Sequence, residues 1–310
     1  MEDIMKKDVT FASAGLKLAG HLYLPDEPTG GKRPAVVVGH PGSGVKEQTA
    51  GLYAERLARA GFIALAFDAA YQGESEGMPR GLEDPAHRVE DIRAAVSFLT
   101  TRDEVDAERI GVLGICASGG YAVTAAATDH RIKAVATISG VDIGRMFREG
   151  HDGKQDPAVL QAMLDAAAAA RTAEARGEGM GSFPLFPESE AQARAGGRYA
   201  FEGWDYYCTA RGQHSRSAKT FTWNSVDRLA SFDGFRFIDL IAPRPLLMIV
   251  GEKADTAYQM PYAFEKAREP KELFWVEGAS HVDLYDREQY VPGVVTKLVD
   301  FFGKCLVTNT

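Results

Sequence analysis

The sequence predicts an α/β fold in which helices cover both faces of one mostly parallel sheet. Three observations support this prediction. Short apolar runs recur along the 310 residues, amphipathic segments separate them, and one apolar run leads through a single reactive side chain into a helix-forming segment. Nearly continuous apolar runs are typical of strands buried on both faces, and their alternation with helices is typical of a parallel sheet.

Eight strands are expected. The first two surround a turn at Ala14 and Gly15, and the partial alternation of apolar and polar residues in the second is typical of an antiparallel edge. The other six are short buried runs. The expected strands are residues 9–11, 16–24, 35–39, 63–67, 110–115, 134–138, 246–250 and 273–276.

Helices are expected between most of these strands. Residues 87–99 place Val89, Ile92, Val96 and Leu99 on one stripe, which indicates a helix packed against the sheet. The remaining helical segments are residues 49–60, 121–127, 265–268 and 294–302.

One long interval breaks this alternation. From about residue 140 to residue 242 no buried strand is apparent, and the sequence is first Ala-rich, then Gly/Pro-rich, then aromatic. About a hundred residues are too many for a connecting loop. We therefore predict an α/β core at 1–140 and 243–310, and a helical cap insertion at 141–242.

Composition excludes several classes of function. The net charge of −8 argues against a nucleic-acid partner. No apolar run approaches the roughly 20 residues of a membrane helix, and the first residues lack the apolar stretch of a signal peptide. Three scattered cysteines indicate neither a disulfide framework nor a metal pair, and no HExxH motif is present. A cytoplasmic protein without metal or other cofactor is expected.

The reactive side chain is Cys116. It follows the apolar run 110–115 and precedes a helix-forming segment, which is the layout of a nucleophile elbow. The tight turn needs small residues two positions before and after the nucleophile, and Gly114 and Ser118 meet this need. A second register, with Ser118 as the nucleophile, remains open, as does a structural role for Cys116 as a small buried hydrophobe.

The predicted base is His281, which follows the last core strand. The predicted acid is Asp255, which follows the strand 246–250, with Glu252 and Asp283 as nearby alternatives. A carboxylate on the imidazole Nδ1 would fix the tautomer and stabilise the imidazolium.

A glycine-rich loop, residues 39–44, follows the third strand and suits an oxyanion hole. Because Pro41 has no N–H group, we place one donor at Gly42 and the other at Ala117, directly after the nucleophile. Further residues are expected to line the substrate pocket, although packing within the cap is an equally good interpretation of its aromatic residues. The expected pocket residues are Ser43, Tyr71, Tyr121, Trp204 and Tyr207.

These motifs resemble those of α/β-hydrolases, and within them the dienelactone-hydrolase-like branch. The resemblance rests on the run from Gly114 through Cys116 to Gly120, on His40-Pro41-Gly42, and on Asp255 and His281 in the family's order. It covers the chain except residues 140–242, which resemble those of a subgroup of hydrolases and polyketide transferases. The resemblance implies an α/β-hydrolase fold and a Cys-His-Asp triad.

We therefore predict a hydrolase that cleaves an ester, lactone or thioester of a small-molecule acyl substrate through an acyl-cysteine intermediate. Acyl transfer by the same triad and a non-catalytic small-molecule binder are the alternatives. A homodimer is compatible with the sequence.

Overall fold

The computed structural model describes residues 4–25 and 31–307, so the first three residues of the N-terminal segment considered above lie outside the described residues. One eight-stranded sheet has the order β1-β2-β4-β3-β5-β6-β9-β10. Strand β2 pairs antiparallel with both β1 and β4, and the other neighbours pair in parallel. The strands are β1 (Ile4–Ser13), β2 (Leu16–Pro25), β3 (Arg33–Gly39), β4 (Ile63–Phe67), β5 (Val105–Ile115), β6 (Ile132–Ile138), β9 (Leu246–Gly251) and β10 (Lys271–Val276).

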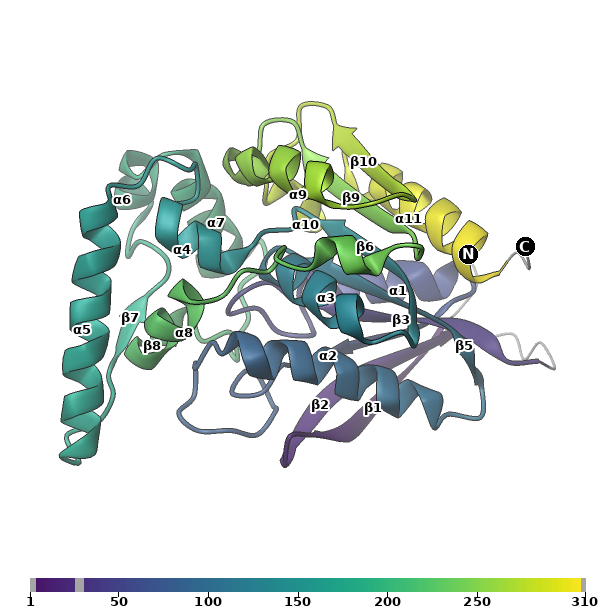
Figure 1. Ribbon diagram of the computed structural model, residues 1–310, viewed down its shortest axis with the longest axis horizontal. Coiled ribbons are helices and arrows are strands. Elements are labelled where there is room, and N and C mark those ends of the chain that lie inside the picture. The colour runs from purple at the N-terminus through teal and green to yellow at the C-terminus, as the bar shows by residue number, and fades with distance from the viewer. Residues whose placement is uncertain (1–3, 26–30, 308–310) are drawn as a thin grey trace.

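Helices cover both faces of this sheet (Figure 1). The helices α2 and α3 pack together on one face, while α1 and α11 pack together on the other. The predicted fold class, a mostly parallel eight-stranded sheet between layers of helices, is confirmed. The helices outside residues 141–242 are α1 (Thr49–Arg59), α2 (Pro85–Thr100), α3 (Ala117–Thr128), α9 (Met260–Lys266), α10 (Asp283–Asp286) and α11 (Val291–Leu306), with the 3₁₀ helix η3 (Asp255–Gln259).

Local sequence explains where these elements begin. Helix α2 starts two residues before the predicted segment because Asp84 caps it, accepting a hydrogen bond from the Ala86 N–H, and Pro85 occupies the first turn. All five residues of β4 are buried, as its unbroken apolar sequence predicts. Strand β5 begins at Val105, five residues before its apolar run, and these added residues are mostly only partly buried.

Residues 141–242, hereafter the insert, lie between β6 and β9. The insert stands at one end of the molecule, away from α11 (Figure 1). Its short two-stranded sheet was not expected from the sequence, and its role as a cap stays a prediction. The elements are α4 (Ile143–Glu149), α5 (Pro157–Ala175), β7 (Ser182–Pro184), α6 (Glu190–Ala195), α7 (Arg198–Cys208), β8 (Thr220–Thr222), η1 (Trp223–Ser225), α8 (Val226–Ala230) and η2 (Ile238–Ile241).

The parallel strands β3, β5, β9 and β10 end at the same edge of the sheet, where open α/β folds bind their ligands. The loops that follow these strands carry the predicted site residues. No helix within the described ranges is long and apolar enough to cross a membrane.

Candidate active site

Cys116 lies in a sharp turn between β5 and α3. Its backbone has φ +54° and ψ −118°, a conformation that costs energy for a residue with a side chain. The turn is tightly packed: a Cβ atom on Gly114 would lie 2.2 Å from the Ser118 carbonyl oxygen, and one on Gly119 would lie 2.4 Å from Gly140 Cα. Glycine is therefore needed at both positions, as expected for a strand-to-helix turn that exposes a nucleophile.

Backbone hydrogen bonds tie this turn to the start of the insert. The Cys116 carbonyl oxygen accepts from the N–H groups of Gly119 at 2.8 Å and Val141 at 3.0 Å. The Val141 carbonyl oxygen in turn accepts from the Gly120 N–H at 3.1 Å. The nucleophile turn and the first residue of the insert thus form one hydrogen-bonded unit.

Ser118 does not occupy the turn. It lies in the first turn of α3, where its hydroxyl donates to the His40 carbonyl oxygen at 2.6 Å and accepts from Arg88 Nη2 at 2.9 Å. The side chain is buried and does not line the pocket described below. Of the two registers considered from the sequence, the structure has the one with Cys116 at the turn.

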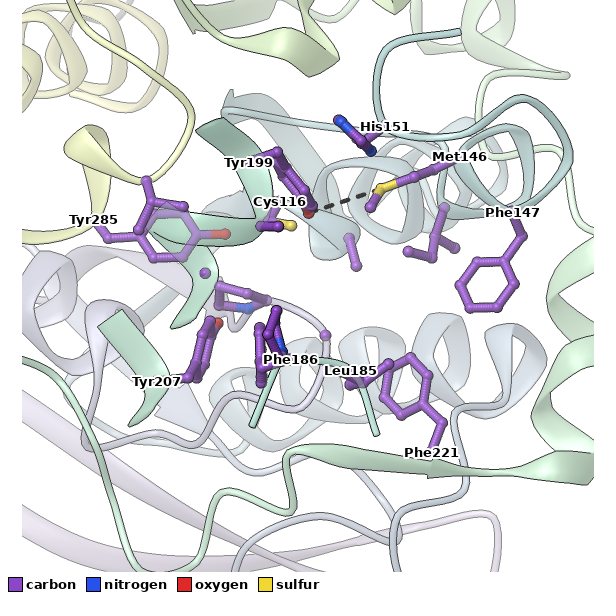
Figure 2. A pocket seen from close by; sticks show the side chains of 18 residues that line it. Cys116, Met146, Phe147, His151, Leu185, Phe186, Tyr199, Tyr207, Phe221 and Tyr285 are labelled. Carbon is purple, nitrogen blue, oxygen red and sulfur yellow. Dashed lines mark hydrogen bonds between the residues drawn. The ribbon is translucent and has the colours of Figure 1, made fainter. Parts of the chain in front are cut away.

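The Cys116 thiol faces a pocket of about 300 Å³. Burial raises the pKa of this thiol, while the nearby Tyr285 hydroxyl and the N–H groups of Ala117 and Gly42 act in the opposite direction. Figure 2 shows the Tyr285 hydroxyl pointing toward the sulfur atom. The two amides chosen from the sequence as oxyanion donors therefore act together on the sulfur atom, and both residues line the pocket.

His281 lies in the loop between β10 and α10 and is almost completely buried. Its Nδ1 is 2.7 Å from Thr256 Oγ1, and its Nε2 is 3.2 Å from Tyr285 Oη. Burial lowers the pKa of this imidazole to about 3, so the ring is neutral at physiological pH. Tyr199 packs edge-on against the ring, with 5.4 Å between the ring centroids.

The predicted acid needs correcting, because Thr256 rather than Asp255 contacts the imidazole. Asp255 begins the 3₁₀ helix η3, and its carboxylate lies 3.9 Å from Arg198 on the insert. Successive residues of a 3₁₀ helix point in directions about 120° apart, which turns Thr256 inward and leaves Asp255 partly exposed.

The two alternative acids bond to backbone N–H groups instead. Glu252 accepts from Gly278 at 3.1 Å, and Asp283 accepts from Ser280 at 3.0 Å. Neither carboxylate has a hydrogen bond to His281 among the described residues.

The glycine-rich loop, residues 39–44, is supported by a buried polar network that sequence reasoning missed. Arg88 Nη2 donates to the His40 carbonyl oxygen at 2.6 Å, and Arg88 Nε lies 3.6 Å from Glu83. His40 Nε2 accepts from the Ala69 N–H at 3.0 Å, and burial lowers the pKa of this imidazole. A signal was present, because Arg88 falls on the apolar stripe of α2, four residues before Ile92.

The structure places several predicted substrate residues outside the pocket. Tyr207 lines it, whereas Ser43, Tyr71, Tyr121 and Trp204 are not among its lining residues. The Tyr121 hydroxyl donates to Glu83 at 2.9 Å, the Tyr71 hydroxyl is 3.1 Å from His87 Nε2, and the Ser43 carbonyl oxygen accepts from Ser217 at 2.8 Å. Trp204 stacks on Phe201 within the insert.

These residues were assigned to the pocket because they lie near the correct edge of the sheet or in the insert. The sequence does not show whether a side chain there faces the ligand or the layer beneath it. The prediction that Ser43, Tyr71, Tyr121 and Trp204 line the pocket is therefore corrected.

Most of the pocket wall comes from the insert, and it is apolar. Among the described residues that line the pocket there is no Lys, Arg, Asp or Glu. Figure 2 shows several of these side chains around the space in front of Cys116. Besides Tyr207, the insert contributes Ile143, Met146, Phe147, His151, Leu185, Phe186, Pro187, Tyr199, Ala200, Gly203 and Phe221.

One insert carboxyl group lies against the histidine loop. Glu202 on α7 accepts from the Val282 N–H at 3.5 Å and from the Ser280 side chain, the residues on either side of His281. Burial raises the pKa of Glu202 to about 7. This carboxyl group links the insert to the loop that holds the predicted base.

Comparisons with known proteins agree with this architecture. The uncharacterized protein YcjY of Escherichia coli (strain K12) is 36% identical, over 98% of this chain and 100% of that protein. The crystal structure of the hypothetical protein PA2218 from Pseudomonas aeruginosa is 38% identical, with a TM-score of 0.91 over 98% of this chain and 94% of that one. The thiohydrolase aneE of Aspergillus aculeatus is 30% identical, over 86% of this chain and 83% of that protein.

The profile of one protein family also matches the chain. It covers residues 18–175, from β2 through the elbow at Cys116 and into α5 of the insert. The matched region contains the nucleophile turn and the glycine-rich loop. With its α/β-hydrolase architecture, the chain belongs to the dienelactone hydrolase family.

Proposed function

We propose that this protein hydrolyses a neutral, apolar ester, lactone or thioester through an acyl-cysteine intermediate on Cys116. The observation that carries the proposal is the position of the sulfur. Cys116 stands in a strained strand-to-helix turn, at the base of an apolar pocket, with the N–H groups of Gly42 and Ala117 beside it. Two such donors can stabilise the oxyanion that develops during acyl transfer.

In the proposed reaction the Cys116 sulfur attacks the carbonyl carbon as its proton passes to His281. The carbonyl oxygen takes the negative charge, held by the two backbone N–H groups. Collapse of this intermediate breaks the bond to the alkoxide or thiolate leaving group, which takes the proton from the imidazolium. Water then attacks the acyl-cysteine, with His281 as general base, and releases the carboxylic acid and the free thiol.

The pocket wall supports an uncharged acyl group as the substrate. A carboxylate or phosphate buried there would have no Lys or Arg to pair with among the described lining residues, and burying an unpaired charge is costly. Arg211, elsewhere in the insert, does not line the pocket. Its guanidinium is already paired with the carboxylates of Asp205 at 3.0 Å and Asp286 at 2.6 Å. The insert, which supplies most of the wall, would act as the cap that selects the acyl group.

The test is a panel of aryl esters, lactones and acyl thioesters assayed with the wild type and with Cys116→Ala. We expect the variant to lose turnover of every substrate that the wild type cleaves, and intact-protein mass spectrometry to detect an acyl adduct on the wild type alone. Cys208→Ala, which removes a thiol outside the pocket lining, is the matched control. Full activity of Cys116→Ala would overturn the assignment.

A further inference from the structure

A phenol, that of Tyr285, lies beside both the predicted base and the predicted nucleophile. The Nε2 atom of His281 that would receive the thiol proton lies 3.2 Å from Tyr285 Oη, and Nδ1 is taken by Thr256. The same Tyr285 hydroxyl points toward Cys116 (Figure 2) and influences the pKa of its thiol. No hydrogen bond between His281 and Cys116 is found among the described residues.

Tyr285 is held rigidly in this position. It lies in α10, four residues after His281, and is only 2% exposed. Two side chains of α1 fix its backbone, because Thr49 Oγ1 donates to the Tyr285 carbonyl oxygen at 3.0 Å and the Tyr53 hydroxyl donates to the Leu284 carbonyl oxygen at 2.6 Å. Its ring packs edge-on against Tyr206, with 5.2 Å between centroids. Contacts from both the α/β core and the insert therefore hold the hydroxyl in place without a substrate.

We propose that Tyr285 is a catalytic residue that passes the proton of the Cys116 thiol to Nε2 of His281. As the sulfur attacks, its proton moves to Tyr285 Oη while the phenolic proton moves to His281 Nε2. The Nδ1–H group of the resulting imidazolium donates to Thr256 Oγ1. Tyr285 ends as it began, a neutral phenol, and both proton transfers reverse when the leaving group is protonated. This relay rests on the proposed cysteine chemistry.

The protonation states of Cys116 and His281 favour proton transfer during the attack over a thiolate–imidazolium pair formed before it. Burial raises the pKa of the Cys116 thiol and lowers that of His281 to about 3, so at rest both groups are neutral. Burial and the neighbouring thiol raise the pKa of Tyr285 well above its ordinary range, which keeps the phenol protonated and able to donate. A neutral thiol and a neutral imidazole need a proton path at the moment of reaction, and Tyr285 supplies one.

The test compares Tyr285→Phe with the wild type in single-turnover acylation by an activated aryl thioester, from about pH 5 to 9. In the wild type His281 is neutral throughout this range, so we expect an acylation rate that changes little with pH. In the variant attack must await the free thiolate, so we expect a rate about 100-fold lower at pH 7 that rises about tenfold per pH unit. The KM should change less than about threefold, since only a hydroxyl is lost.

Tyr290→Phe is the matched control, because it removes a hydroxyl that donates to the Gly278 carbonyl oxygen outside the pocket lining. An unchanged rate and pH profile in Tyr285→Phe would overturn the relay while leaving the acyl-cysteine intact. Absence of any acyl adduct in the wild type would overturn both proposals.

A second measurement uses only the wild type and so does not depend on the folding of the variant. Two protons move in one step of the relay, so the acylation rate in mixtures of H₂O and D₂O should fall along a curve. A straight line would indicate one proton in motion, and thus direct transfer from Cys116 to His281.

Discussion

The elbow and the insert border the same pocket but are built in different ways. Around Cys116, α3 is almost wholly buried and glycines let backbone atoms approach closely. In the insert, the 19 residues of α5 include one buried residue, Ala167. The backbone around Cys116 is thus closely packed on all sides. The insert supplies an apolar pocket wall, but its outer helix α5 is packed against few other residues. Substitutions should accordingly cost most beneath the elbow and least on the outer surface of the insert.

The largest effect on stability is expected from Arg88→Met. The change removes the cation beside buried Glu83 and the donor that holds the His40 carbonyl oxygen, so we expect a loss of about 3–5 kcal/mol in the free energy of unfolding. Urea denaturation measures it. Arg93→Met, on the exposed face of the same helix, should cost less than about 1 kcal/mol. The double variant Arg88→Met, Glu83→Gln should lose less than Arg88→Met alone, because the unpaired carboxyl group is gone; an equal loss would argue against the ion pair.

Gly114→Ala should come next. Its Cβ atom would lie 2.2 Å from the Ser118 carbonyl oxygen, so β5 and α3 must separate. We expect the free energy of unfolding, measured by thermal or urea unfolding, to fall by about 1–3 kcal/mol, and most of the proposed hydrolase activity to be lost. Gly303→Ala is the control, since no atom lies within 4 Å of the added Cβ on α11; it should be neutral or slightly stabilising. Equal behaviour of the two variants would remove the basis for a tightly packed elbow.

An intermediate effect that depends on pH is expected where the insert meets the histidine loop. The pKa of Glu202 is raised from 4.5 to about 7 in the folded protein, so its contribution is fully present below pH 4.5 and is lost as the pH rises toward 7. After allowance for screening by solvent, this loss is roughly 1–2 kcal/mol.

In Glu202→Gln the free energy of unfolding should therefore decrease less between about pH 4.5 and 7 than it does in the wild type. Urea unfolding at several pH values measures this. Glu190→Gln, on the exposed face of α6, is the control. If the two variants and the wild type show parallel pH profiles, Glu202 is not the group responsible.

The smallest effect is expected on the outer surface of the insert. Arg171 on α5 makes two hydrogen bonds to Asp227, at 2.7 and 3.0 Å, but both side chains are substantially exposed. Arg171→Ala should lower the free energy of unfolding by less than about 1 kcal/mol, and the loss should shrink further at high salt. A loss as large as that of Arg88→Met would show that the insert is not the looser region.

The fold could be predicted because its signals are local. Strands such as β4 are buried on both faces, so their apolar runs stand out, and the glycines around Cys116 mark a turn that only small residues allow. The two-stranded sheet of β7 and β8 could not be predicted, because each strand has three residues and pairs with a segment far away in the chain.

The candidate site could be predicted only in part. The positions of Cys116, His281 and the Gly42 loop follow from the order of strands, because parallel strands end at one edge of the sheet. The direction of a side chain does not follow from that order: Thr256 faces the imidazole because η3 turns its neighbour Asp255 away. Tyr285 could have been proposed from its spacing, since it follows His281 by four residues and lies in a short helix.

The hydrogen bonds between the turn at Cys116 and residue 141 limit which part of the insert can move relative to that turn. Val141 is fastened on both sides to the turn that carries Cys116, and the next residue, Asp142, accepts from the Gly144 N–H at 3.0 Å and donates its own N–H to Gln259 at 2.8 Å. Any movement of the rest of the insert that keeps these hydrogen bonds must therefore hinge beyond Asp142. Such a movement would reshape the pocket wall and leave the backbone of the Cys116 turn in place.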